Sequence, residues 1–489
     1  MTVKFEFIDG TKKDPRTRRL ARSHAMKGKN VGKKHNRRSR VAQAAPSPAS
    51  PTPISDLGGK IPSPESTVQH HDQTCQSSRP RSQDGGHSMA PRRPHLVPVA
   101  SRPLNGRFPF HFPVDATPQS QYVIKQFFAD VTKVMFPVQL CQSLDKVNSH
   151  LLSVLFRDQT SYHCSMALMA TLNHFMFGKE MSAVAAIHHL TQAVGLVNQA
   201  LDTPAALSDA NLSVVNFVVV QKLLRGERSE AEVHLRGLER MIQLRGGLSS
   251  LQQDSMLMLK ICKTDLDVAL HFGTATFFYR DQMPKVLSRL TASSFAPPTY
   301  FAARGSEFKD MDGCLYRVFL DVADLAQFFN QGFRIDPLDL QEAIASIGYR
   351  LSRFQPMASP FPRTKLGSVC HVALTALMTT LFLQIGRRRF LRYGLVGQRL
   401  RDVVTSGLDN DCHDIMLWLL FLGGISVARE DDEEWLLTQI QHTARAGGVH
   451  DWKDLHRRVL RLPWIKSLHD EDAERLWYSS LRLTTTHPA

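Results

Sequence analysis

The sequence has few cysteines, and none of them is paired at short range. Seven cysteines are spread over 489 residues, and none forms the C-x-x-C spacing of a metal or redox motif. An odd, dispersed set of cysteines is typical of reduced thiols in the cytosol or the nucleus. The sequence therefore excludes a disulfide-stabilised scaffold and predicts no structural zinc site.

Catalytic and cofactor motifs are also absent. The chain contains no G-x-S-x-G, no P-loop, no G-x-G-x-x-G and no H-E-x-x-H. Its adjacent pairs His163-Cys164, His188-His189 and Cys412-His413 are poor metal ligands, because neighbouring side chains diverge on a helix. We therefore expect a non-enzymatic protein with no catalytic residue, no cofactor and no metal.

A secretory signal is missing as well, since MTVKFEF is followed at once by basic residues. One stretch, residues 366–385, has no charged residue and is long enough to span a bilayer. It nevertheless contains His371, Gln384 and several hydroxyl residues. We predict a buried core helix there, and no membrane partner.

Positive charge is concentrated at the N-terminus. The formal net charge is +15, and residues 1–40 carry fourteen Lys and Arg against three acidic residues. The residues after 110 are almost electrically balanced. This asymmetry predicts a basic arm, residues 1–40, that meets polyanions such as nucleic acid, an anionic membrane or an acidic import receptor.

The candidate binding residues are the cations of this arm. The cluster KKHNRRSR indicates a nuclear-import signal. Phosphate contact, arginine insertion into a narrow DNA groove and a simple solubilising tail remain alternatives. The candidates for contact with DNA or an import receptor are Arg16, Arg18, Arg19, Arg22, Lys27, Lys29, Lys33, Lys34, Arg37, Arg38 and Arg40.

Residues 41–118 are predicted to be a disordered linker. Fourteen of the 26 prolines lie between Pro46 and Pro118, among Ser, Gln and Gly. Such a segment buries too little apolar surface to offset its ordering entropy. Four Ser-Pro or Thr-Pro steps, beginning at Ser47, Ser50, Thr52 and Ser63, suggest phosphorylation that would offset the charge of the arm. An unmodified linker is the equal alternative.

Residues 119–482 are predicted to form one large all-α domain. Apolar residues recur at helical spacing from Ile124 to Met135, and no series of alternating strands or fixed repeat is visible. The clearest further helices are predicted at residues 166–177, 184–198, 212–224, 315–329 and 338–354.

Two helices near the middle of the chain are the best defined. Ser229 and Glu232 have the spacing of a capping box, and Gly246-Gly247 would end that helix. A second helix is expected from Ser255 to Phe272, packed antiparallel to the first across a short loop. A second glycine pair, Gly423-Gly424, is also interpreted as a helix cap.

The same residues carry a family resemblance. HLRGLERMIQLRGG (234–247) followed by LKICKTDLDVAL (259–270) resembles a signature of the fungal-specific transcription factor domain. In that family a "GL..M...RGG" helix precedes a helix with a "D...A" core. MLWLLFLGGISVARE (416–430) and LPWIKSLHDEDAERLW (462–477) resemble its later "W...GG" and "W…LW" segments. The likeness spans roughly residues 120–480.

The N-terminus fits the same resemblance with one departure. FEFIDGTKKDPRTRRLARSHAMKGKN (5–30) resembles a leader with an "R.HAM" core that is common in fungal proteins of this type. Proteins with this leader commonly lack the six-cysteine zinc cluster that reads DNA. This chain lacks it too, because its first cysteine is Cys75.

The sequence thus predicts a nuclear transcriptional regulator of fungal type. The arm would serve import and DNA phosphate contact, while the helical domain would offer a regulatory surface or pocket to other transcription regulators or a small effector. The main alternative is a nuclear co-regulator or scaffold that never touches DNA. An enzyme with a hidden motif and a protein of ribosomal RNA metabolism are further alternatives.

Overall fold

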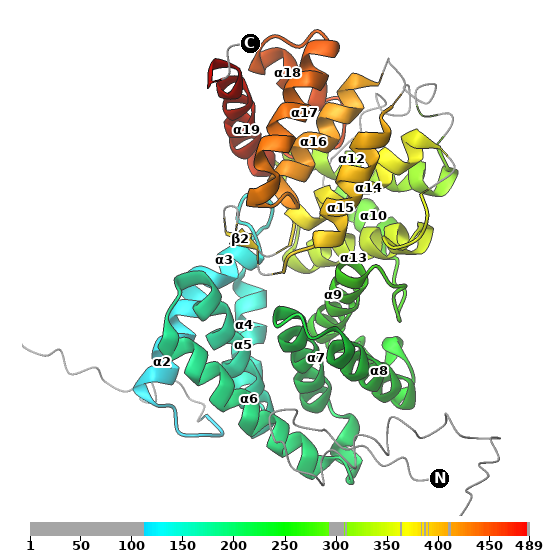
Figure 1. Ribbon diagram of the computed structural model, residues 1–489. Coiled ribbons are helices and arrows are strands. Elements are labelled where there is room, and N and C mark those ends of the chain that lie inside the picture. The colour runs from blue at the N-terminus through cyan, green and yellow to red at the C-terminus, as the bar shows by residue number, and fades with distance from the viewer. Residues whose placement is uncertain are drawn as a thin grey trace, which may run out of the picture. The chain divides into compact units, whose positions relative to one another are not determined.

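The computed structural model describes residues 112–292, 308, 311–361, 364–382, 384–385, 388–389, 391–408 and 412–486. Within these residues the chain is helical, apart from one short strand pair and one isolated bridge (Figure 1). The prediction of an all-α fold is confirmed. The basic arm and most of the predicted linker lie outside the described residues.

The N-terminal helices are joined by short turns. They are α2 (Pro118–Gln126), α3 (Thr132–Met135), α4 (Asp145–Leu155), α5 (Gln159–Phe177), α6 (Glu180–Ala200), α7 (Asp209–Leu224) and α8 (Arg228–Arg245). A π-helical turn, Phe127–Val131, joins α2 to α3. The apolar pattern that predicted one helix here therefore continues through a local widening of the helix.

The remaining elements follow a short turn at residues 248–251. They are α9 (Ser255–Phe272), α10 (Met283–Ala292), α12 (Gly313–Asn330), α13 (Pro337–Phe354), α14 (Lys365–Thr380), β1 (Gln384–Ile385), β2 (Arg388–Arg389), α15 (Gly394–Ser406), α16 (His413–Ser426), α17 (Glu433–Ala446), α18 (Trp452–Val459) and α19 (Lys466–Thr486). The two strands pair antiparallel. All five further predicted helices are present, as α5, α6, α7, α12 and α13.

Side-chain caps explain several helix starts. The carboxylate of Asp158 accepts a hydrogen bond from the Ser161 N–H at 2.7 Å, and Asp254 accepts from the Leu257 N–H at 3.0 Å. These bonds satisfy backbone donors that have no partner inside the helix. Helix α8 ends at Gly246, which has a φ of 111° that only glycine adopts without strain. The prediction of this glycine end is confirmed.

The predicted capping box of α8 is wrong. The helix begins at Arg228, so Ser229 lies inside its first turn and the cap position has no side-chain hydrogen bond. Glu232 instead accepts a hydrogen bond from Arg228 Nε at 3.0 Å. The capping-box pattern assigned the Glu232 carboxylate to a backbone N–H, but it pairs with the side chain of Arg228 one turn earlier.

Helix α14 confirms the prediction of a buried core helix. Every residue from Gly367 to Thr380 is buried, and α14 packs against α12, α13, α15 and α16. Trp418 of α16 and Trp464 are among the largest fully buried side chains. The predicted helix ends earlier than expected, because Gln384 and Ile385 belong to β1. Among the described residues, no helix combines the length and hydrophobicity that crossing a membrane requires.

Gly423 and Gly424 do not cap a helix, which corrects the second glycine prediction. Both lie inside α16. A Cβ on Gly423 would come within 2.4 Å of Leu400 Cδ2 on α15. A Cβ on Gly424 would come within 2.8 Å of both Leu436 on α17 and Leu476 on α19. These glycines therefore let three helices approach α16 closely.

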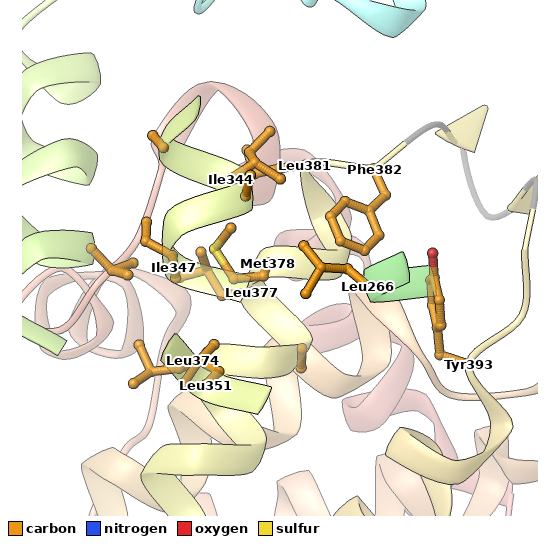
Figure 2. Close-up of a cluster of buried hydrophobic side chains, with 14 of the residues drawn as sticks. Leu266, Ile344, Ile347, Leu351, Leu374, Leu377, Met378, Leu381, Phe382 and Tyr393 are labelled. Atoms are coloured by element: carbon orange, nitrogen blue, oxygen red, sulfur yellow. The ribbon is translucent and has the colours of Figure 1, made fainter. Parts of the chain in front are cut away.

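Helix α9 lies at the centre of the packing. It contacts α7, α8, α13 and α15, and most of its residues are buried. Figure 2 shows the cluster in which Leu266 of α9 converges with side chains of α13 and α14. Helices α8 and α9 contact each other, but α8 packs chiefly against α7 and α9 chiefly against α13. The antiparallel direction of the pair stays a prediction.

Candidate functional site

Arg245, which precedes the paired glycines, ties α8 to the start of α7. Its guanidinium donates to the Asp209 carboxylate at 2.5 Å and to the Leu207 carbonyl at 3.1 Å. Gly247 continues the reversal after Gly246 with a φ of 87°. These residues turn the chain from α8 toward α9, so this part of the motif is structural.

Asp265 of α9 anchors the segment that follows the helix. Its carboxylate accepts hydrogen bonds from the N–H groups of Phe277 and Phe278, each at 2.9 Å. The Tyr349 hydroxyl donates to it at 3.1 Å. Burial raises the pKa of Asp265 to about 6, although these three hydrogen bonds oppose the shift. Asp265 therefore also has a structural role.

A cavity of about 230 Å³ lies beside α9. Its mostly apolar wall is built by α3, α4, α5, α7, α9, α13, α14 and the segment around Phe382 and Tyr393. A cavity of about 150 Å³ lined by apolar side chains holds benzene. The space beside α9 is therefore large enough for a small organic molecule.

Helix α9 places two lysines one turn apart on the cavity wall. The ammonium of Lys263 pairs with the Asp267 carboxylate and lies 3.6 Å from the centroid of the Phe382 ring. Asp267 also accepts a hydrogen bond from the Tyr393 hydroxyl at 2.7 Å. Figure 2 shows Phe382 and Tyr393 on the segment that follows α14. The charge of Lys263 is thus balanced within the wall.

Lys260 differs, because its ammonium has no hydrogen bond or ion pair within the described part of the chain. The carboxylate that acts on it electrostatically is that of Asp254. That carboxylate already lies 3.4 Å from His150 Nε2 and 3.6 Å from Arg157 Nη2. Burial lowers the pKa of Lys260, and Arg157 lowers it further, while Cys164 and Asp254 act in the opposite direction.

Two other polar groups on the wall bear on what the cavity can hold. Asn216 of α7 is 7 % exposed, and its Oδ1 is a buried acceptor without a partner. Burial raises the pKa of the Cys164 thiol to about 12, so this cysteine stays protonated and unreactive. The wall therefore offers one uncompensated cation and one free acceptor in an apolar setting.

A histidine pair joins α5 to α6 outside the cavity. His163 Nδ1 and His189 Nδ1 lie 2.9 Å apart, so one ring donates to the other. Burial, with a smaller contribution from His163 and His188, lowers the pKa of His189 to about 4. One member of the pair His163-Cys164 therefore contacts one member of the pair His188-His189, and the sequence analysis did not predict this contact. The described residues contain no group of three metal-ligating side chains.

The residues that line the cavity are not the ones that the sequence predicted as binding residues. All eleven candidate cations, from Arg16 to Arg40, lie outside the described residues, so their role remains a prediction. Sequence reasoning missed the lysines of α9. The signal was present, because Lys260, Lys263 and Asp267 form a charged stripe at spacings of three and four along a largely apolar helix.

Comparison with known proteins gives one match. The family model of the fungal specific transcription factor domain matches residues 122–455, which covers more than half of the chain and every helix from α4 to α17. The match includes the predicted signature at 234–247 and 259–270. No curated protein and no solved structure matches the chain significantly.

Proposed function

Because the chain belongs to the fungal-specific transcription factor domain family, we propose that it is a non-enzymatic regulator of transcription that acts in the nucleus. The single observation that carries this proposal is the family match over residues 122–455. The absence of known catalytic motifs in the sequence agrees with a regulator.

We assign nuclear entry and phosphate contact to the arm, residues 1–40. The excess of Lys and Arg there, and the dense cluster between Lys33 and Arg40, fit an import receptor. The same cations can neutralise DNA phosphates, which gives affinity without sequence preference. With no six-cysteine cluster in the chain, sequence specificity would come from another transcription regulator.

Chromatin immunoprecipitation tests this function with three versions of the chain. The full chain should enter the nucleus and give defined peaks at promoters. Deletion of residues 1–45 should remove both nuclear entry and the peaks. The third version carries the same deletion and an unrelated import signal. Its peaks should stay absent if the arm contacts DNA. A full chain with no promoter enrichment would contradict direct action on chromatin.

A non-DNA-binding co-regulator is the second candidate, and the missing zinc cluster favours it. In that case the arm serves import alone and the helical domain is recruited by a partner. The third version of the chain separates the two functions, because an unrelated import signal would then restore the promoter peaks fully.

A further inference from the structure

We propose that the cavity beside α9 binds a small monocarboxylate with an apolar body, and that Lys260 pairs with its carboxylate. The proposal goes beyond transcriptional regulation and does not depend on it, because binding is measured on the purified chain. It rests on three features of the wall: its charge, its size and its polarity.

The charge of the wall calls for a single anion. Lys260, Lys263 and Asp267 are the charged groups among the described lining residues. Lys263 and Asp267 neutralise each other. Lys260 is left half-buried on the wall with an ammonium that lacks a counter-ion among the described residues, an arrangement that a bound anion would improve. One carboxylate would restore neutrality, whereas a doubly charged phosphate would leave one negative charge in excess.

Size and lining define the rest of the ligand. The volume of about 230 Å³ is roughly one and a half times that of a benzene-sized cavity. Apolar side chains such as Leu168, Leu172 and Val220 supply most of the wall. The body of the ligand should therefore be a short aliphatic chain or a single ring. The free Oδ1 of Asn216 would favour a ligand that also carries a hydroxyl or amide donor.

Among the described residues, neither Cys164 nor Asp254 provides a counter-ion for Lys260. The thiol of Cys164 is protonated, and Asp254 is engaged by His150, Arg157 and the Leu257 N–H. A water molecule could solvate Lys260, but it would leave the net positive charge in place. An anionic ligand removes that charge and fills apolar space with the same molecule.

Isothermal titration calorimetry of the full chain tests the proposal with three probes of equal length: octanoate, octanamide and octylammonium. Octanoate should bind at least about tenfold more tightly than octanamide at neutral pH, which corresponds to about 1.4 kcal/mol. Octylammonium should bind more weakly than octanamide, because it brings a second positive charge next to Lys260. Equal affinities for octanoate and octanamide, or no binding of any probe, would overturn the proposal.

A pair of lysine variants assigns the effect. Lys260→Met keeps the length of the side chain and removes its charge. It should abolish the preference for octanoate over octanamide and raise the Tm of the ligand-free chain. Lys285→Met is the matched control, because Lys285 is exposed on α10, and it should change neither property. If Lys260→Met still prefers octanoate over octanamide, Lys260 does not pair with the carboxylate.

A further variant keeps the test decisive if Lys260→Met fails to fold. Val220→Phe adds a ring to the cavity wall without touching the lysine. It should weaken octanoate and octanamide alike, by about tenfold or more, because both would lose the space for their chains. If Val220→Phe leaves both affinities unchanged, the probes bind elsewhere and the proposed site is wrong.

Discussion

His469 of α19 donates a buried hydrogen bond from Nε2 to Thr380 Oγ1 at the end of α14, over 2.9 Å. The tautomer follows from the other ring nitrogen, because Nδ1 accepts from the Ile465 N–H at 3.1 Å. Thr380 in turn donates to the Leu377 carbonyl at 2.6 Å. This chain of bonds ties α19 to α14, whose residues from Gly367 to Thr380 are all buried.

Removal of the Thr380 hydroxyl tests this tie. Thr380→Val keeps the shape of the side chain but leaves the His469 N–H buried without an acceptor, so we expect a loss of about 1–3 kcal/mol in the free energy of unfolding. Thr380→Ser retains the hydroxyl and should cost less. Urea denaturation of the three proteins measures the difference. Equal stability of the Val and Ser variants would contradict the hydrogen bond.

Acid should destabilise the fold through its buried histidines. The pKa of His189 is about 4 in the folded chain and about 6.5 when unfolded, so the unfolded state binds more protons between these values. The contribution of His189 is therefore present above pH 6.5 and is lost as the pH falls toward 4. Burial lowers the pKa of His371 to about 4 and that of His469 to about 3, which adds to the effect.

The slope of the free energy of unfolding against pH, compared between the unchanged chain and a His189 variant, isolates the effect of His189. Carboxyls such as Asp265, whose raised pKa stabilises the fold as the pH falls, contribute equally to both slopes. In His189→Asn the free energy of unfolding should fall less steeply between pH 6.5 and 5, by up to about 1.4 kcal/mol per pH unit. Chemical denaturation at several pH values gives both slopes. Identical slopes would show that His189 is not held neutral by the fold.

Asp265→Asn should be strongly destabilising. The amide has one acceptor oxygen in place of two, and its NH₂ faces the N–H group of Phe277 or Phe278. We expect a loss of about 2–4 kcal/mol in the free energy of unfolding. Asp202→Asn is a matched control at an exposed position and should change stability by less than about 0.5 kcal/mol. A similar effect of both substitutions would refute the anchoring role.

Two glycine-to-alanine substitutions should change the stability of the fold in opposite directions. Gly423→Ala should destabilise by about 1–3 kcal/mol, because its Cβ meets the buried Leu400 side chain. Gly237→Ala in α8 meets nothing within 4 Å and should stabilise by up to about 1 kcal/mol. Thermal unfolding of both variants provides the measurement. Stabilisation by Gly423→Ala would mean that α15 does not pack closely on α16.

The arm should make DNA binding by the full chain depend steeply on salt. Each neutralised phosphate contributes about −0.9 to the slope of log K against log salt. Replacement of Lys33, Lys34, Arg37, Arg38 and Arg40 by Gln should flatten that slope by up to about 4.5. Fluorescence anisotropy with a generic duplex measures it, and Lys125→Gln and Lys285→Gln serve as controls. A slope unchanged in the five-fold variant would remove this cluster from the interface.

Local sequence determined much of α8, α9 and the turn between them. Helical apolar spacing located both helices, and the Ser255–Phe272 bounds of α9 agree with the prediction. The sequence identified Gly246 as a helix end because glycine, which has no Cβ, tolerates a positive φ wherever it occurs. The Ser229 capping box failed because Arg228 offered Glu232 a competing partner, a choice that residue spacing alone does not decide.

The roles of glycines and charges inside the fold required tertiary structure. Gly423-Gly424 has the same local appearance as Gly246-Gly247, yet its neighbours come from α15, α17 and α19. His163 and His189 lie 26 residues apart in the sequence, and only the packing of α5 on α6 brings their rings together.

By itself, the sequence determined that this protein is helical after residue 118, that its positive charge gathers at the N-terminus, and which family it resembles. These follow from periodicity, composition and short motifs, which are properties of neighbouring residues. Only the tertiary structure decided that Lys263 is neutralised by Asp267 while Lys260 faces a cavity without a counter-ion. The physical reason is that a lysine is paired or unpaired according to which distant helices surround it.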